Sequence, residues 1–260
     1  MKREWRWAGL VAALVLAAFT PGAFAEEAHV YVAAHASYPE LSGDGLTAGT
    51  GVTAYDVEET LDAGGSDLHL GLDIFGRFGR HRLVAGFSQG EHEGENSLSQ
   101  AFGFDGQLVT SGDFDSKIDL SRRKLLYGFA FVNSGMVDFG VLVGSEGYDL
   151  STKLSQFGSS REVQIDSPAP AIGLNFGVRP PVVPLRLYGE VVYSSLEISD
   201  VDTTLTDATV SLDLYIIPVL KLFGFQAGYR YYDLEAEDKA QGAKFNYKFQ
   251  GPFAGVVLRF

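Results

Sequence analysis

The chain has 260 residues, of which 46% are hydrophobic, no cysteine, and a formal net charge of −13. The lack of cysteine excludes a disulfide framework and a thiolate metal site, and the acidic balance disfavours nucleic acid as a partner. After the first 25 residues no stretch approaches the roughly 18 consecutive apolar residues of a transmembrane helix. The hydrophobic residues must therefore be distributed in another pattern.

The first 25 residues have the pattern of a secretory signal peptide. Lys2, Arg3 and Arg6 form a positive segment, residues 7–20 are largely apolar, and Ala23-Phe24-Ala25 is a small-x-small cleavage motif. A retained anchor is the weaker alternative, because the apolar run is shorter than the roughly 20 residues of a spanning helix. We expect a signal peptide at 1–25 and one β-domain at 26–260.

Apolar and polar residues then alternate with a period of two, which is typical of strands with one apolar face. Turn sequences at 77–80, 133–135 and 179–184 separate several of these runs. Residues 118–123 are out of phase with the run that follows, which predicts either a bulge or an extension of that strand. The pattern predicts ten strands, at 28–38, 67–76, 82–89, 118–131, 137–144, 172–178, 185–194, 210–216, 223–232 and 251–260.

The predicted connections alternate between long and short. Long or acidic loops are expected at 39–65, 90–115, 145–168, around Asp200 and at 233–238, and each follows an odd-numbered strand. Short turns follow the even-numbered strands. An even number of strands places both chain ends on the side of the short turns.

The last strand alternates to the end of the chain, with Phe260, Leu258 and Val256 on one face. An apolar-faced strand that ends on phenylalanine resembles the closing strand of bacterial outer-membrane β-barrel proteins. The resemblance implies an all-β fold, a transmembrane antiparallel up-and-down barrel of about ten strands, with eight as the alternative. It also implies that these three residues close the barrel and signal its assembly. A soluble β-sandwich or lipocalin-like barrel would bury the same faces and is the competing interpretation.

The same resemblance implies a location and partners. Short turns would face the periplasm and long acidic loops the exterior. A monomer would sit among outer-membrane lipid and lipopolysaccharide, after help from periplasmic chaperones and the barrel-assembly machinery. Nucleic acid is not expected as a partner.

The opposite strand faces carry charged residues that would point into the barrel. Charges in a narrow interior are tolerated when they are paired or hydrated, so we expect a network of ion pairs that braces a filled barrel. A narrow water-filled path for small solutes or ions is the alternative. The predicted lumen network comprises Asp73, Arg82, Lys124, Asp138, Arg186, Glu190, Asp213, Arg230 and Arg259.

Two motifs suggest chemistry, and neither is complete. His35 and Ser37 share one strand face, as a base and a nucleophile would, and resemble the His-x-Ser pattern of outer-membrane lipid deacylases and phospholipases. In those families the pair faces lipid, whereas here the phase points inward, and no orienting acid is evident. Glu91-His92-Glu93, in a predicted glycine-rich loop, offers at most a weak divalent-ion site.

The ten-stranded omptin proteases use Asp-Asp and Asp-His pairs, which this chain lacks. We therefore expect no catalytic activity, no cofactor and no metal. The predicted function is a structural or surface role in the outer membrane, with a narrow porin-like channel as the alternative.

Overall fold

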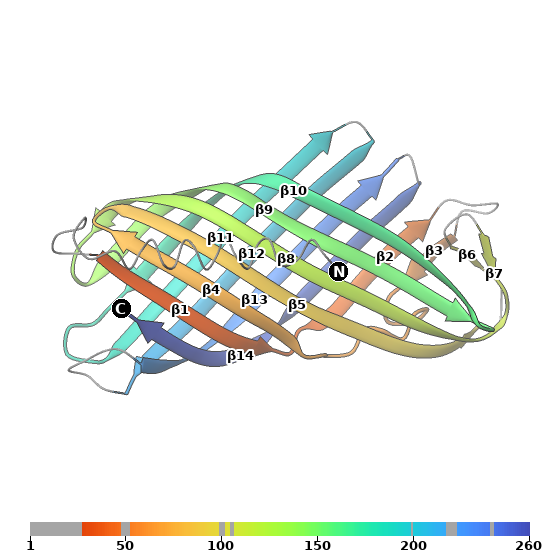
Figure 1. Cartoon of the computed structure of the whole chain (residues 1–260), viewed down its shortest axis with the longest axis horizontal. Coiled ribbons are helices and arrows are strands. Elements are labelled where there is room, and N and C mark those ends of the chain that lie inside the picture. Colours follow the sequence, from red (N-terminus) through yellow and green to blue (C-terminus); the bar gives the residue numbers. More distant parts are fainter. Residues whose placement is uncertain are drawn as a thin grey trace.

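Ten strands form a ring in which each pairs with the ring strand before it, and the last pairs with the first, so the sheet closes on itself (Figure 1). The computed structural model describes residues 28–47, 53–98, 102–104, 107–198, 200–216, 223–239 and 242–260, and the expected signal peptide at 1–25 lies outside them. The ring consists of β1 (Ala28–Ser37), β4 (His69–Phe78), β5 (His81–Leu98), β8 (Gly112–Asn133), β9 (Val137–Gln156), β10 (Ser159–Val178), β11 (Leu185–Ile198), β12 (Val201–Tyr215), β13 (Phe223–Asp238) and β14 (Ala243–Arg259).

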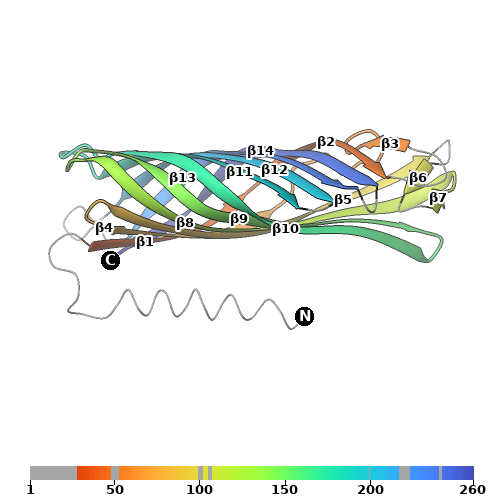
Figure 2. The ribbon, with the colours of Figure 1, turned by 90° about the horizontal axis from the view of Figure 1, so that it is seen from above.

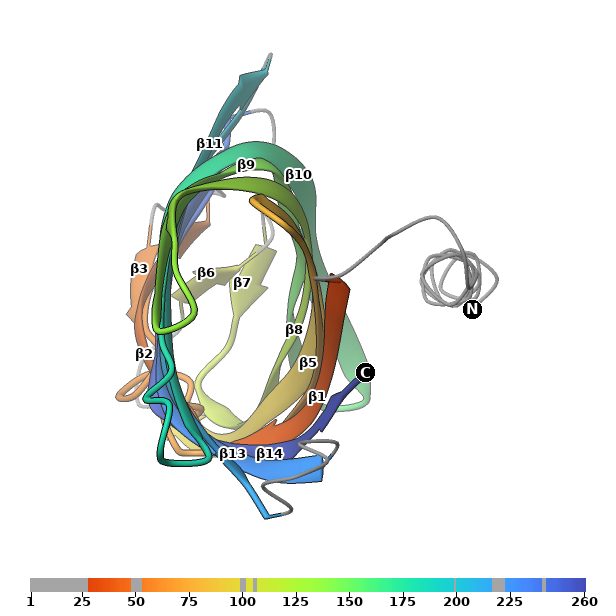
Figure 3. The ribbon, with the colours of Figure 1, turned by 90° about the vertical axis from the view of Figure 1, so that its left-hand side faces the viewer.

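The ring has ten antiparallel strands, which confirms the predicted up-and-down barrel. Viewed along its length it is an oval cylinder (Figure 3). The described residues contain no helix that is both long and apolar enough to cross a membrane.

The seam between β1 and β14 closes the barrel. Leu258 lies opposite Val32, and Val256 lies opposite Ala34. Phe260 extends this pairing by one residue, because its backbone N–H and C=O both bond to Val30, at 2.8 and 3.1 Å. The C-terminal residue is therefore held in the sheet.

Several strands run far beyond their predicted ends. The predictions of long loops at 90–115 and 145–168 are wrong over most of their length, because β5, β8, β9 and β10 continue through them. β9 and β10 meet at a tight turn in which Phe157 and Gly158 both have positive φ, at 50° and 77°, a conformation typical of two-residue hairpin turns. The predicted acidic loop at 233–238 is likewise part of β13.

The region predicted as a loop at 39–65 also contains strands. β2 (Glu40–Thr47) pairs with β14 beyond the end of β1, and β3 (Thr53–Asp56) pairs with β2. β6 (Phe102–Phe104) and β7 (Gln107–Val109) form a small separate hairpin. All four lie at the end of the barrel away from the C-terminus (Figures 1 and 2).

Residues 118–123 of β8 explain why the strand ends were misplaced. Even-numbered residues point inward without interruption from Phe114 to Ala130, so these residues form an extension without a bulge. The register shift on this strand lies instead between Ala130 and Val132. The chemistry changes while the geometry continues, since outward residues are polar up to Arg123 and apolar from Leu125 onward.

The barrel therefore has two halves with opposite chemistry. The belt half, near the short turns, exposes a band of large apolar side chains on its outer surface, including Leu70, Phe87, Leu125, Val143, Ile172, Leu174, Val191, Leu212, Phe225 and Val256. The extended half, at the other end, buries apolar residues inside. A soluble barrel would not leave the apolar faces outside, so that interpretation is wrong.

Candidate functional site

A layer of charged residues crosses the lumen where the two halves meet. Arg122 on β8 donates through Nε to Glu146 Oε1 of β9 at 2.6 Å and also bonds to Asp207 of β12. Lys124, two residues on, bonds to Glu190 of β11 and lies 3.6 Å from Asp207. Strands far apart in the ring are therefore tied together through the interior.

A second group ties β13 to the other wall. Arg230 donates to Asp73 Oδ2 at 3.1 Å and to Thr209 Oγ1 at 3.1 Å. Its Nη1 also lies 3.3 Å from His35 Nε2. This group and the Arg122 layer leave little open width in the middle of the lumen.

Near the short turns the interior is rich in arginine. Arg186 bonds to Asp213 at 3.3 Å, whereas Arg82 and Arg179 both approach Asp138, at 4.0 and 3.2 Å. Arg259, at the end of β14, contacts His29 Nε2 at 3.1 Å.

The structure places all nine predicted network residues on the inner face of the barrel. Three further residues of this network were not predicted from the sequence: Arg122, Glu146 and Asp207. All three are nearly inaccessible to solvent. Arg122 fell in the stretch thought to be out of phase, and the two acids fell in or beside predicted loops. The alternation that continues through β8, β9 and β12 is the signal that would have found them.

Two small cavities lie within this network. The larger, about 50 Å³, is lined by Tyr31, Asp73, Arg186 and Gln226, among others. The second, about 30 Å³, lies beside Ser37, His69 and Arg122. Buried atoms around the larger cavity, such as Asp73 Oδ1 and Gln226 Oε1, have no protein partner, so these atoms can accept hydrogen bonds from a few ordered waters.

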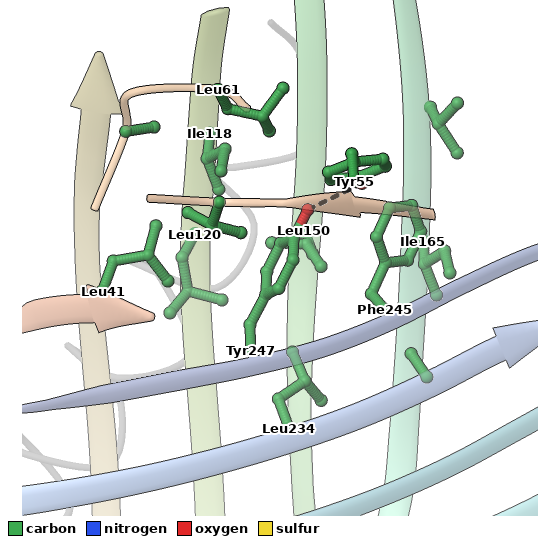
Figure 4. Close-up of a cluster of buried hydrophobic side chains, with 14 of the residues drawn as sticks. Leu41, Tyr55, Leu61, Ile118, Leu120, Leu150, Ile165, Leu234, Phe245 and Tyr247 are labelled. Atoms are coloured by element: carbon green, nitrogen blue, oxygen red, sulfur yellow. Dashed lines mark hydrogen bonds between the residues drawn. The ribbon is translucent and has the colours of Figure 1, made fainter. Parts of the chain in front are cut away.

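Beyond the charged layer, the extended half is filled by apolar side chains (Figure 4). They come from the ring strands β8, β9, β10, β12, β13 and β14 and from the segments outside the ring. Members with no more than 1% exposure include Leu41, Val57, Leu61, Phe104, Ile118, Tyr148, Leu150, Leu205, Leu234, Phe245 and Tyr247. Side chains at these positions meet across the lumen, because the strands that carry them lie on different sides of the ring. We call this set the apolar plug.

Part of the plug comes from the segment predicted to be a solvated loop. Residues 57–63 fold into the lumen, where Leu61 is fully buried. Asp56 Oδ1 accepts the N–H groups of Glu58 and Glu59 and so starts a tight turn. The Leu61 carbonyl accepts a 2.6 Å hydrogen bond from Ser116 on β8, so this segment is fastened to the inner wall.

A short polar chain lies inside the plug. The hydroxyls of Tyr55 and Tyr247 are 2.9 Å apart, and Thr152 Oγ1 lies 3.2 Å from Tyr247. Burial raises the pKa of Tyr247 to about 12. Both phenols therefore stay protonated at neutral pH, and each can donate a hydrogen bond to its neighbour.

The structure changes the assessment of His35 and Ser37. Asp73 lies 3.6 Å from His35 Nδ1, so an acid is present beside the imidazole, contrary to the sequence-based expectation. The other ring nitrogen faces Arg230 rather than a nucleophile. Ser37 instead lines the smaller cavity near His69. The arrangement holds His35 in an ion-pair network and does not form a base and nucleophile pair.

Glu91, His92 and Glu93 lie on β5 and not in a loop. Alternation sends the two carboxylates outward, while the imidazole is buried and lies 3.0 Å from the His69 ring nitrogen. The three side chains cannot converge on one ion. Within the described ranges, no group of three possible His, Asp or Glu ligands is close enough to hold a metal.

No family model matches the chain, and no curated protein matches its sequence. Solved structures do resemble it. The outer-membrane protease OmpT from Escherichia coli superposes with a TM-score of 0.57 at 10% identity, over 93% of this chain and 99% of that one. The chain has the fold of a bacterial outer-membrane β-barrel. This likeness concerns the fold alone and transfers no activity.

Two further solved structures match with lower TM-scores. The translocator domain of the autotransporter NalP from Neisseria meningitidis matches with a TM-score of 0.46 and 16% identity, over 98% of this chain and 95% of that one. The attachment invasion locus protein Ail of Yersinia pestis matches with a TM-score of 0.40 and 14% identity, over 89% of this chain and 99% of that one.

Proposed function

We propose that this outer-membrane β-barrel has a structural or surface role and that its lumen is closed to solutes. The observation that carries this proposal is the apolar plug, which fills the extended half with side chains such as Ile118, Leu150 and Tyr247. A hydrated ion would have to shed water to cross this region, and no charged group within it replaces that water. The barrel would conduct only if the plug moved.

The orientation is part of the proposal. The short turns and the C-terminus would face the periplasm, and the extended half would project from the outer surface. Its outer face is polar, with Asp119, Arg123 and Glu162 among the outward residues, as expected for a wall in contact with water or lipopolysaccharide sugars. The isolated ring closes by itself at the β1–β14 seam, which supports a monomer. Phe260 at that seam is well placed for recognition by the assembly machinery.

A narrow channel is the second candidate. The two small cavities and the charged layer around Arg122 favour it, because their charged and polar side chains would hold water and ions in the lumen. In this alternative, residues 57–63 would move out of the lumen to open the channel.

Conductance in planar bilayers separates the two candidates. The purified wild-type protein should be silent. Replacing residues 57–63 with a Gly-Ser linker of equal length should produce steady steps, because it removes Val57 and Leu61 from the plug. Glu58→Gln, an exposed change in the same segment, is the control and should be silent. Steady steps from wild type would support the channel and contradict the closed lumen.

A further inference from the structure

Charge is unevenly distributed along the lumen. In the middle, three cations (Arg122, Lys124 and Arg230) face four carboxylates (Asp73, Glu146, Glu190 and Asp207). At the short-turn end, five arginines gather, which we call the arginine cluster: Arg77, Arg82, Arg179, Arg186 and Arg259. Among the described residues, the ion pairs give this cluster only Asp138 and Asp213. Among side chains, the cluster thus combines five positive charges with two paired carboxylates.

Shared partners join the five arginines into one group. Arg77 and Arg82 both donate to Asn133 Oδ1, and Arg82 and Arg179 share Asp138. Three guanidinium carbons surround the Tyr31 ring, with Arg186 at 4.6 Å, Arg259 at 5.5 Å and Arg179 at 5.9 Å from its centroid. Three of the positive charges are therefore concentrated around the Tyr31 ring, and the other two adjoin them through Asn133 and Asp138.

Several donors in this cluster have no acceptor. Nε of Arg77, Arg82 and Arg179 and both Nε and Nη2 of Arg186 are buried without a protein partner. Arg77, Arg82 and Arg186 are each at most 6% exposed. Buried donors of this kind are normally satisfied, and water alone would leave the excess charge in place. An anion would satisfy both requirements.

The cluster is reachable from one end. The Arg179 side chain is 16% exposed, so it links the buried arginines to solvent at the short turns. The larger cavity, lined by Tyr31 and Arg186, begins beside the cluster. Planar guanidinium groups hydrogen-bond well to oxyanions, often through two parallel bonds.

We propose that the arginine cluster binds a small oxyanion of the phosphate or sulfate class that enters from the short-turn end. The anion is a free one rather than a lipid headgroup, because the cluster faces the lumen and the acyl chains lie outside the barrel. The proposal does not depend on a closed lumen, since the site needs access from one end only. If the wild-type barrel proves to conduct, the proposal of an anion site still stands.

The test is isothermal titration of the full-length protein, purified in a nonionic detergent at low ionic strength, with inorganic phosphate and separately with sulfate. Saturable binding to wild type is expected. Arg179→Gln should weaken it about tenfold, as for loss of one charge-assisted hydrogen bond. The affinity of Arg179→Lys should lie between those of wild type and Arg179→Gln, because lysine keeps the charge but loses the planar guanidinium group. Added salt should weaken binding in all three proteins.

The control is Arg80→Gln, which removes the same charge from the exposed β4–β5 turn at the same end. It should change affinity by less than about twofold, because solvent screens an exposed charge. If Arg179→Gln does not fold, Arg259→Gln at the partly exposed C-terminal end takes its place. Absence of saturable binding to wild type, or equal losses in the Arg80 and Arg179 variants, would overturn the proposal. Binding of a short-chain phosphatidylglycerol without binding of inorganic phosphate would also overturn it.

Discussion

The belt half and the extended half are built from the same strands in the same phase, yet the polarity of their outer surfaces is opposite. On β8, Leu126 and Ile118 both point inward, and Leu125 and Lys117 both point outward. In the belt half the outside is apolar and the inside combines charged residues with a smaller apolar cluster that includes Leu126, Leu142 and Val192. In the extended half the outside is polar and the inside is apolar. The solvent outside each part of the wall accounts for the difference, because lipid and water favour opposite surfaces.

The comparison also explains how the barrel is closed. The outer surface of the belt half is in contact with lipid, and its lumen holds paired charges beside a smaller apolar cluster. The extended half stands in water and gains stability from a core, as a soluble protein does. The plug closes the lumen of the extended half, the paired charges narrow the lumen of the belt half, and the two regions meet at Arg122.

Removing that junction should have the largest effect. Arg122→Met leaves Glu146 and Asp207 buried with less compensation, and we expect a loss of about 3–5 kcal/mol in the free energy of unfolding. Urea unfolding in lipid vesicles, followed by circular dichroism, measures this loss. Arg123→Met, an outward neighbour whose partner Asp166 is exposed, should lose less than about 1 kcal/mol. Similar losses in the two variants would mean that the buried pairs contribute no more than surface pairs.

The outer surfaces of the two halves can be compared on β10. Leu174→Arg places a charge in the apolar belt and should destabilise the folded barrel in vesicles by about 2–4 kcal/mol. Gln164→Arg lies on the same face of the same strand in the extended half and should change stability by about 0.5 kcal/mol or less. Equal effects at the two positions would contradict a boundary between lipid and water on this strand.

The plug should respond as a protein core does. Tyr247→Phe removes the hydroxyl that contacts both Tyr55 and Thr152 and leaves their hydroxyls with fewer partners. We expect a loss of about 1–3 kcal/mol. Tyr229→Phe, on the exposed belt surface, is the matched change and should be close to neutral. A neutral Tyr247→Phe would show that the polar chain in the plug is not needed for its packing.

The smallest effect concerns pH. Burial lowers the pKa of His92 from its ordinary value of 6.5, so the folded protein holds this imidazole neutral. The unfolded chain takes up the proton first as pH falls, and stability should therefore be full above about pH 6.5 and decline below it. His92→Gln should remove part of this slope. A wild-type slope between pH 7 and 5 that equals the variant's would show that His92 does not titrate differently on folding.

The boundary between the belt half and the extended half also explains which parts of the strands could be predicted from the sequence. Strands such as 137–144 and 172–178 were found because their outward residues are apolar, as lipid requires. Past residue 145 the alternation persists with the opposite sign, with Asp149 outward and Leu150 inward, and a search for lipid-facing strands interpreted it as loop. The inverted alternation, together with the length of these segments, is the sequence signal from which the longer strands could have been predicted.

The interior was predictable only in part. Arg82 and Asp138 could be placed inside because they lie in clear belt strands, whereas Glu146 could not, because its strand was thought to have ended. The position of Leu61 in the lumen had no sequence signal, since it depends on a turn at Asp56 and a contact with Ser116 that lie far apart in the chain. The pairing of His35 with Asp73 likewise required the register of β1 against β4.

The most direct test uses the absence of cysteine in the chain. Variants with a single cysteine in place of Lys117, Ile118 or Leu174 would be treated with a membrane-impermeant maleimide. The protein would be held in lipid nanodiscs, where both ends of the barrel are accessible. We predict fast labelling at Lys117→Cys, and almost none at Ile118→Cys, inside the plug, or at Leu174→Cys, in the lipid belt. Fast labelling at Ile118→Cys would show a water-filled extended half and contradict the closed lumen.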